Sequence, residues 1–294
     1  MKFSGSICAL ATPFGADDAL DLDAFGRLIE FQIAGGTAAV VVAGSTGEAH
    51  ALDEAEYERL LTFAVSQVRG RIPVIAGTGG ANTRKTVATT QRAKACGANA
   101  ALVVTPYYVR PTQEGLVRHY EQVAELGGLP VILYNVPGRT ACDMQPQTVA
   151  ALAPDPRVVG IKEAVADAAR MRDLIALRSD GFSVLSGDDS TALRSLLDGA
   201  DGVISVANNV APRLFHAMCD AAVRGNRAQA EAFGARLDAL FDALGWESNP
   251  IPLKWALGEL GLGTARVRLP LTSLSLPHRE PLRELVRSLQ DAAV

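Results

Sequence analysis

The chain has 294 residues, of which 48% are hydrophobic and 20% are charged, and its formal net charge is −4. This composition is typical of a globular protein with a large core. The small negative charge and the scattered arginines exclude the basic surface that nucleic acids and anionic membranes require of a partner. The length is compatible with a single α/β barrel.

Four cysteines and four histidines are dispersed along the chain, without C-x-x-C or H-E-x-x-H spacing. This pattern predicts reduced thiols in a cytoplasmic protein and no metal site. The apolar stretch that ends before Pro13 is too short for a signal peptide. The longest uncharged stretch, between Glu30 and Glu48, is interrupted by Gln32 and Gly35, so no membrane span is expected.

Short runs of apolar, often β-branched residues recur along the chain. Their hydrophobicity is continuous rather than alternating, which is typical of parallel strands that are covered on both faces. Eight strands are predicted in this way: Gly5–Leu10, Ala39–Ala43, Pro73–Ala76, Ala101–Val104, Val131–Tyr134, Val158–Lys162, Phe182–Leu185 and Gly202–Val206.

Helical patterns with start signals separate these runs. Asp53 precedes the segment Glu54–Val68, and Asp167 precedes Ala168–Leu177. Eight alternations of strand and helix predict an α/β fold, the (β/α)8 or TIM barrel. A doubly wound open sheet is the main alternative, although it usually has fewer strands before the chain reverses.

No further strand is predicted after Val206. Amphipathic patterns continue from about Pro212 to the end of the chain, and they exceed what the eighth βα unit needs. We therefore expect a catalytic barrel at residues 1–224 and a helical C-terminal domain at residues 225–294.

Lys162 is unexpected where it stands, at the end of the apolar run that begins at Val158. A lysine at the mouth of a buried strand loses hydration, which lowers its pKa and increases the fraction of nucleophilic amine. Such an amine can condense with a ketone or aldehyde to a Schiff base. The alternative is a structural ion pair, for example with Glu163.

Polar residues gather at the predicted strand ends, where barrel enzymes have their active sites. The turn Gly44–Gly47 offers backbone amides for a carboxylate, although such turns are often only structural. Gly77–Gly80 lacks the full spacing of a dinucleotide fingerprint and is interpreted as a backbone turn. Asp188 and Asp189 are adjacent, which favours helix capping over a metal pair.

Several motifs at these strand ends identify a family. The chain is similar, from Ser6 to about Leu274, to the dihydrodipicolinate synthase (4-hydroxy-tetrahydrodipicolinate synthase) family. This family lies within the class I, pyruvate-dependent aldolase superfamily that also contains N-acetylneuraminate lyase. The motifs are Gly44-Ser45-Thr46-Gly47-Glu48, Tyr107-Tyr108 with Arg110-Pro111, Tyr134-Asn135-Val136-Pro137-Gly138-Arg139-Thr140, Gly160-Ile161-Lys162-Glu163, Ser186-Gly187-Asp188-Asp189, Gly202-Val203-Ile204-Ser205 and Asn249-Pro250-Ile251-Pro252.

The resemblance implies a lyase that joins pyruvate to L-aspartate 4-semialdehyde in lysine and diaminopimelate biosynthesis. Lys162 would form the Schiff base with pyruvate, and Tyr134 would be the acid and base that moves protons. Thr46 would link Tyr134 to Tyr108, which in this family comes from a neighbouring subunit. The enzyme would be a cytoplasmic homotetramer, a dimer of dimers, without metal or organic cofactor.

The resemblance also implies the substrate-binding residues. The backbone amides of Ser45 and Thr46 would hold the pyruvate carboxylate, and Gly187 and Ile204 would line the pocket with backbone groups. Arg139 would bind the carboxylate of the aldehyde with two parallel hydrogen bonds.

Three alternatives stay open at this point. The chain could be an N-acetylneuraminate lyase or a keto-sugar-acid aldolase or dehydratase of the same superfamily, or a catalytically silent barrel that binds pyruvate-like ligands. Arg139 favours the synthase, because the lyases lack this arginine. Ser45 points the other way, because many synthases have threonine there and serine is common among lyases.

Lysine inhibits many synthases of this family at the dimer interface. In this chain Glu54 and Tyr57 stand where the sensitive members have histidines, and Lys85 stands where they have a glutamate. A one-position shift of the comparison would instead bring Asn82 into the site. The resemblance therefore implies weak inhibition by lysine, or none.

Overall fold

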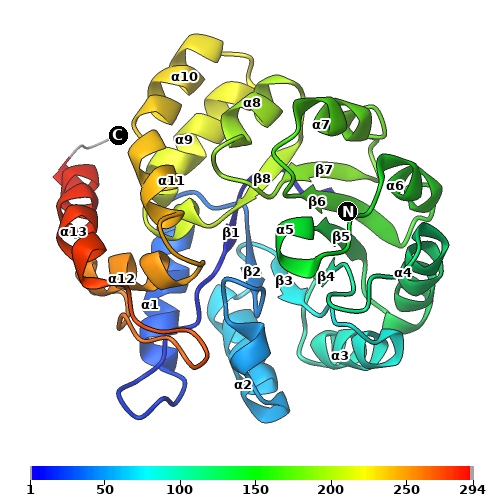
Figure 1. Ribbon diagram of the computed structural model, residues 1–294, viewed down its shortest axis with the longest axis horizontal. Coiled ribbons are helices and arrows are strands. Elements are labelled where there is room, and N and C mark those ends of the chain that lie inside the picture. Colours follow the sequence, from blue (N-terminus) through cyan, green and yellow to red (C-terminus); the bar gives the residue numbers. More distant parts are fainter. Residues whose placement is uncertain (1, 292–294) are drawn as a thin grey trace.

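The computed structural model describes residues 2–291 and shows eight parallel strands that close into a barrel, in the order β1 to β8 (Figure 1). The barrel closes because β1 pairs with β8, with Gly5 opposite Gly202. The strands are β1 Gly5–Ala9, β2 Ala39–Val42, β3 Val74–Gly77, β4 Ala100–Val104, β5 Val131–Asn135, β6 Val158–Glu163, β7 Ser183–Ser186 and β8 Gly202–Ser205.

Helices surround the barrel and continue beyond it (Figure 1). Those between and beside the strands are α1 Leu22–Ala34, α2 Glu54–Val68, α3 Thr83–Ala95, α4 Gln113–Gly127, α5 Pro137–Thr140, α6 Pro146–Leu152, α7 Ala168–Ile175, α8 Ala192–Leu197 and α9 Pro212–Val223, with the 3₁₀ turns η1 Ala49–Ala51 and η2 Ala207–Asn209. The later ones are α10 Arg227–Ala235, α11 Asp238–Leu244, α12 Ile251–Glu259 and α13 Leu276–Asp291.

The predicted (β/α)8 barrel is confirmed, and the open-sheet alternative is wrong. Each predicted strand ends within one residue of the observed one. The helix start signals are confirmed as well: Asp53 forms a capping box with Glu56, and the Asp167 side chain accepts hydrogen bonds from the first turn of α7. The prediction placed the end of α7 two residues too late, at Leu177 instead of Ile175.

Two hydrophobic clusters divide the interior into layers. The inner cluster fills the barrel and includes Ile7, Val41, Tyr134 and Ile204. The outer cluster lies between the strands and the helices. Because successive residues of a strand face opposite sides, each strand contributes to both layers. This alternation decides which strand-end residues face the interior of the barrel.

The helices after α9 are not a separate body, because their apolar side chains belong to the outer cluster of the barrel. Helices α11 and α12 both pack against α13 (Figure 1). We propose residue 224, directly after α9, as the boundary between the barrel at residues 1–224 and the helical extension at residues 225–294; residues 1 and 292–294 lie outside the described part.

None of the helices within residues 2–291 combines the length and apolar character that crossing a membrane requires.

Candidate active site

Lys162 and Tyr134 lie side by side on neighbouring strands. Tyr134 of β5 is paired in register with Lys162 of β6, and Lys162 Nζ lies 4.4 Å from the centroid of the Tyr134 ring. The exposed fraction is only 5% for Lys162 and 8% for Tyr134. An amine and a phenol thus share a desolvated environment, where a nucleophile and an acid or base can act on one small ligand.

Glu163 follows Lys162 in the sequence but does not pair with it. Its carboxylate accepts hydrogen bonds from Asn135 Nδ2 at 3.1 Å and from the amide of Val165 at 2.9 Å, and it lies 3.4 Å from Arg170 Nη1. Burial raises the pKa of this carboxyl group, although these donors act in the opposite direction. The alternative of a structural ion pair between Lys162 and Glu163 is therefore wrong, because neighbours on a strand face opposite sides.

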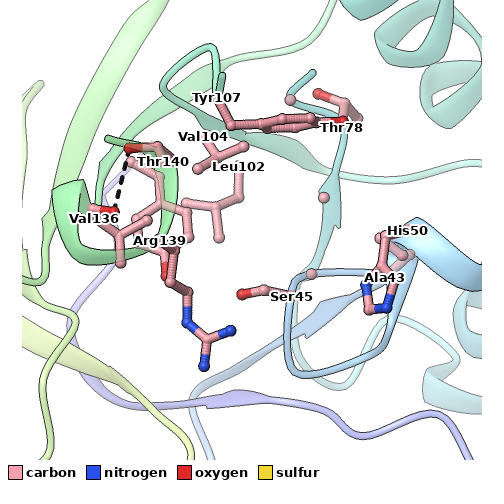
Figure 2. A pocket seen from close by; sticks show the side chains of 15 residues that line it. Ala43, Ser45, His50, Thr78, Leu102, Val104, Tyr107, Val136, Arg139 and Thr140 are labelled. Atoms are coloured by element: carbon pink, nitrogen blue, oxygen red, sulfur yellow. Dashed lines mark hydrogen bonds between the residues drawn. The ribbon is translucent and has the colours of Figure 1, made fainter. Parts of the chain in front are cut away.

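A cavity of about 270 Å³ opens beside Tyr134 at the carboxyl ends of β2 to β5. Figure 2 shows the Ser45 hydroxyl and the Arg139 guanidinium projecting toward each other across it. Lys162 is not among the lining residues, but its Nζ lies against the ring of Tyr134, which is one of them. The volume suits small carboxylates rather than an extended ligand.

The turn that follows β2 presents two kinds of group. The backbone amides of Ser45 and Thr46 donate to no acceptor within residues 2–290, which leaves them available for a carboxylate. The Ser45 side chain lines the cavity, whereas the Thr46 side chain does not. Thr46 Oγ1 instead accepts a hydrogen bond of 2.9 Å from Asn249 Nδ2. This differs from the expectation that the Thr46 hydroxyl faces Tyr134.

Arg139 lies on the single turn α5 and extends into the cavity (Figure 2). Its Nη2 donates a long hydrogen bond, 3.2 Å, to the carbonyl of Asn249. No carboxylate side chain within residues 2–290 forms an ion pair with it, so its remaining N–H groups can bind an anionic ligand. Asn249 thus contacts both Thr46 and Arg139. Its motif pointed to the family in the sequence, but nothing there revealed these contacts.

Gly187 lies against the Lys162 side chain, and Ile204 belongs to the inner cluster of the barrel. A Cβ atom at Gly187 would lie 2.7 Å from Lys162 Cε, so no other residue fits without moving the lysine. The amide of Gly187 donates a hydrogen bond of 2.7 Å to the carbonyl of Glu163. Ile204 is fully buried in the inner cluster with Tyr134. The structure therefore brings both residues to the interior that Lys162 occupies.

The loop after β4 does not bring Tyr108 into the cavity of its own chain. Tyr107 lines the cavity (Figure 2), whereas Tyr108 is 90% exposed. The backbone of Tyr108 and Arg110 is left-handed, with φ of 74° and 46°, which is unfavourable for residues other than glycine. A strained loop that holds an aromatic side chain in water is a typical sign of an interface.

The remaining strand-end motifs have structural roles. A Cβ at Gly77 would lie 2.1 Å from the carbonyl oxygen of Ala43. The backbone turn expected there therefore requires a glycine, because the segment after β2 passes close to it. Asp188 accepts from the amide of Thr191, just before α8. Asp189 accepts from the amides at the start of η2. Both aspartates accept hydrogen bonds near helix starts, but neither is the predicted N-cap, since the N-cap residues are Thr191 for α8 and Val206 for η2.

Comparison with known proteins now decides the family. The sequence model of the dihydrodipicolinate synthetase family matches residues 2–289. The chain belongs to this family. Within it, the 4-hydroxy-tetrahydrodipicolinate synthase of Stenotrophomonas maltophilia (strain K279a) is 57% identical over 278 residues, which cover 95% of this chain and 93% of that protein.

Solved structures of the dihydrodipicolinate synthetase family have the same fold. The chloride-inhibited dihydrodipicolinate synthase of Acinetobacter baumannii, complexed with pyruvate, is 44% identical, with a TM-score of 0.95 over 98% of this chain and 99% of that one. A dihydrodipicolinate synthase characterised as the first monomeric variant is 40% identical, with a TM-score of 0.96 over 98% of this chain and 97% of that one.

Membership of the dihydrodipicolinate synthetase family settles the class of activity. The chain is a lyase that acts through a Schiff base. The catalytically silent barrel and the lyases or aldolases with other aldehydes are not favoured.

Proposed function

We propose that this enzyme is a 4-hydroxy-tetrahydrodipicolinate synthase, which condenses pyruvate with L-aspartate 4-semialdehyde in lysine and diaminopimelate biosynthesis. The observation that carries the proposal is the buried Lys162 beside Tyr134, in a chain that is 57% identical to such a synthase. Arg139, which has no carboxylate partner of its own in the described chain, supports an anionic aldehyde as the second substrate.

The reaction begins when the lone pair of Lys162 Nζ attacks the ketone carbon of pyruvate. Loss of water gives an iminium, which withdraws electrons and lets a methyl proton leave, so that an enamine forms. The enamine carbon then attacks the aldehyde carbon, and the aldehyde oxygen takes up a proton. The substrate's amino group finally attacks the former ketone carbon and displaces Lys162 as the ring closes. Because the condensed lysine withdraws the electrons, the reaction requires no metal or organic cofactor.

Tyr134 carries the protons in this sequence, because its phenol lies against the amine that becomes the iminium. A proton relay must continue from Tyr134 to a hydroxyl in the cavity. We assign this role to Ser45 and not to Thr46, since Ser45 lines the cavity and Thr46 does not; Thr46 Oγ1 accepts a hydrogen bond from Asn249 instead. The backbone amides of both residues hold the pyruvate carboxylate.

Replacing each hydroxyl separately tests this assignment. Ser45→Ala is expected to lower kcat roughly 10- to 100-fold, because a relay of protons is interrupted. Thr46→Val is expected to cost mainly stability, about 1 kcal/mol for the lost hydrogen bond with Asn249. Steady-state kinetics and denaturant unfolding of the two variants measure both effects. A larger loss of kcat in Thr46→Val than in Ser45→Ala would restore the relay through Thr46.

A panel of aldehydes tests the second substrate. The enzyme is incubated with pyruvate and aspartate semialdehyde, N-acetylmannosamine or glyceraldehyde, and the consumption of pyruvate is followed. We expect turnover with aspartate semialdehyde to exceed turnover with the two uncharged sugars by a wide margin. Preferential use of N-acetylmannosamine would replace the proposed synthase by a sialic acid lyase.

We further propose a dimer of dimers in which Tyr108 completes the active site of the neighbouring subunit. The exposed, left-handed loop that carries Tyr108 supports this arrangement, as does the absence of Tyr108 from the cavity of its own chain. A cytoplasmic location is proposed with it, in keeping with four free cysteines.

Mixed oligomers test the shared site. Tyr108→Phe and Lys162→Ala subunits are each expected to have little activity. When they exchange into hybrids, some sites combine an intact Lys162 with an intact Tyr108 of the partner subunit, and activity is expected to return. Hybrid formation is verified by mass spectrometry of differently tagged subunits. Verified hybrids that stay inactive would contradict a Tyr108 that acts in trans.

Lysine is expected to inhibit this enzyme weakly or not at all. The cavity near Tyr107, at the start of α2 and α3, is lined by Glu54, Lys85 and Arg92. Glu54 is already paired with Arg92 at 2.7 Å, and Lys85 adds a positive charge that opposes the ammonium group of lysine. A titration of activity with lysine measures the effect. Half-inhibition at sub-millimolar lysine would prove this prediction wrong.

A further inference from the structure

A buried ion pair joins the turn after β2 to the C-terminal helices. The carboxylate of Glu48, which closes the turn Gly44–Glu48, lies 2.5 Å from Nζ of Lys254 on α12. Glu48 is 0% exposed and Lys254 is 1% exposed. The second carboxylate oxygen accepts a hydrogen bond of 2.9 Å from the backbone amide of Arg268. Two segments of the extension thus hold one side chain of the turn.

The surroundings of this pair are apolar on one side. Lys254 Nζ lies 4.1 Å from the centroid of the Phe14 ring, and the Arg268 guanidinium lies 4.2 Å from the same centroid. Burial lowers the pKa of Lys254 to about 8, although Glu48 acts in the opposite direction. The ion pair therefore does not fully offset the loss of hydration. A buried ion pair of this kind contributes little to the free energy of folding, so stability alone does not explain why Glu48 and Lys254 are paired here.

The backbone conformation of the turn indicates what the ion pair does. Glu48 has a left-handed φ of 52°, which costs free energy for a residue with a side chain. Its amide donates to the carbonyl of Ser45, and the amide of Ala49 donates to the carbonyl of Gly44. These bonds bend the chain so that the amides of Ser45 and Thr46 lack internal acceptors within the described residues. Contacts of the Glu48 side chain can hold this conformation.

We propose that Glu48 and Lys254 are positioning residues, which fix the turn Gly44–Glu48 so that the amides of Ser45 and Thr46 meet the carboxylate of pyruvate. Neither side chain touches the substrate. The helical extension acts through them on the first half-reaction, the formation of the Schiff base. This inference deepens the proposed function and rests on it, because it concerns the site assigned to the pyruvate carboxylate.

Replacing both members of the ion pair by uncharged residues distinguishes an effect on the position of the turn from an effect on the stability of the protein. In the double variant Glu48→Gln/Lys254→Met, no charge is buried, and the side-chain carbonyl oxygen of the introduced glutamine can still accept from the amide of Arg268. The double variant is expected to fold, while each single variant leaves one buried charge without a partner. Its kcat/KM for pyruvate is expected to fall on the order of 10- to 100-fold, with a smaller loss for aspartate semialdehyde.

Glu56→Gln is the matched control. Glu56 forms an ion pair with Arg268, the residue whose amide binds Glu48, but it does not contact the turn. The control is expected to lose stability without changing kcat/KM for pyruvate. Hydrogen exchange provides a measurement that does not depend on turnover: the amides of residues 48 and 49 are expected to exchange faster in the double variant than in the control.

The outcomes distinguish this inference from the proposed function. Wild-type protein that forms no adduct with pyruvate would overturn both. If the wild type reacts and the folded double variant keeps its kcat/KM for pyruvate and its slow exchange, the positioning role is wrong and the proposed function stands. Equal losses for pyruvate and the aldehyde, with unchanged exchange in the turn, would also contradict the positioning role.

Discussion

Replacing Lys162 by alanine is expected to lower the rate of condensation by roughly 10³- to 10⁶-fold, the range found when a covalent nucleophile is removed. Its amine is the group beside Tyr134 that forms the iminium in the proposed reaction. Without the iminium, the methyl protons of pyruvate are too weakly acidic for Tyr134 to remove. Steady-state assays with both substrates measure the loss.

The control for this variant is Lys85→Ala. Lys85 is a lysine of α3 outside the cavity beside Tyr134. Its replacement shows whether the loss of a lysine elsewhere in the protein lowers the rate of condensation. Both variants are checked for cooperative unfolding, because the removal of a buried side chain also leaves a cavity. Substantial condensation by folded Lys162→Ala, in the absence of contaminating wild type, would transfer the nucleophile to another residue.

The second large effect is expected at Arg139. Arg139→Ala removes a guanidinium that extends into the cavity and has only one long hydrogen bond within the described residues, to Asn249. Loss of a charge-assisted, bidentate contact with a carboxylate costs about 2 to 4 kcal/mol, or roughly 30- to 1,000-fold in kcat/KM for aspartate semialdehyde. The formation of the pyruvate adduct is expected to change little, because the pyruvate carboxylate is proposed to bind the turn after β2.

Arg139→Lys is the informative companion. Lysine keeps the charge but cannot donate two parallel hydrogen bonds, so most of the loss is expected to persist. The two half-reactions are compared by measuring kcat/KM for each substrate in turn. An unchanged kcat/KM for aspartate semialdehyde in Arg139→Ala would make the arginine structural and reopen the lyase alternative.

Most of the fold could be predicted from the sequence because parallel strands that are covered on both faces leave a continuous apolar run. The ends of these runs are marked by residues such as Lys162 that change the pattern, so the strand limits agree within one residue. Since active sites of barrels collect at these ends, Tyr134, Lys162 and the turn after β2 could be predicted together.

The contacts between distant segments could not be predicted in the same way. Asn249 reaches Thr46 across 203 residues of sequence, and Lys254 reaches Glu48 across 206. Such contacts depend on how the C-terminal helices return over the barrel, which no local pattern encodes. The expectation that Thr46 forms the relay came from the family resemblance, and the side-chain positions in the turn favour Ser45 instead.

The ion pair considered between Lys162 and Glu163 was a different kind of error. Strand alternation alone sends these neighbours to opposite faces, with Lys162 toward Tyr134 and Glu163 toward Asn135 and Arg170. The same two strands carry both groups of contacts, since Asn135 and Glu163 are the next pair in register on β5 and β6 after Tyr134 and Lys162. Lys162 and Tyr134 therefore lie on two strands that are also joined, on their opposite face, by the buried polar side chains of Asn135 and Glu163.

The central claim, a Schiff base between pyruvate and Lys162, is tested most directly by trapping it. Wild-type enzyme is treated with pyruvate and borohydride, and the intact mass and the digested peptides are measured. We expect one pyruvate-derived group per chain, attached at Lys162, and no label in Lys162→Ala. A label at another lysine, or equal labelling of Lys162→Ala, would contradict the mechanism.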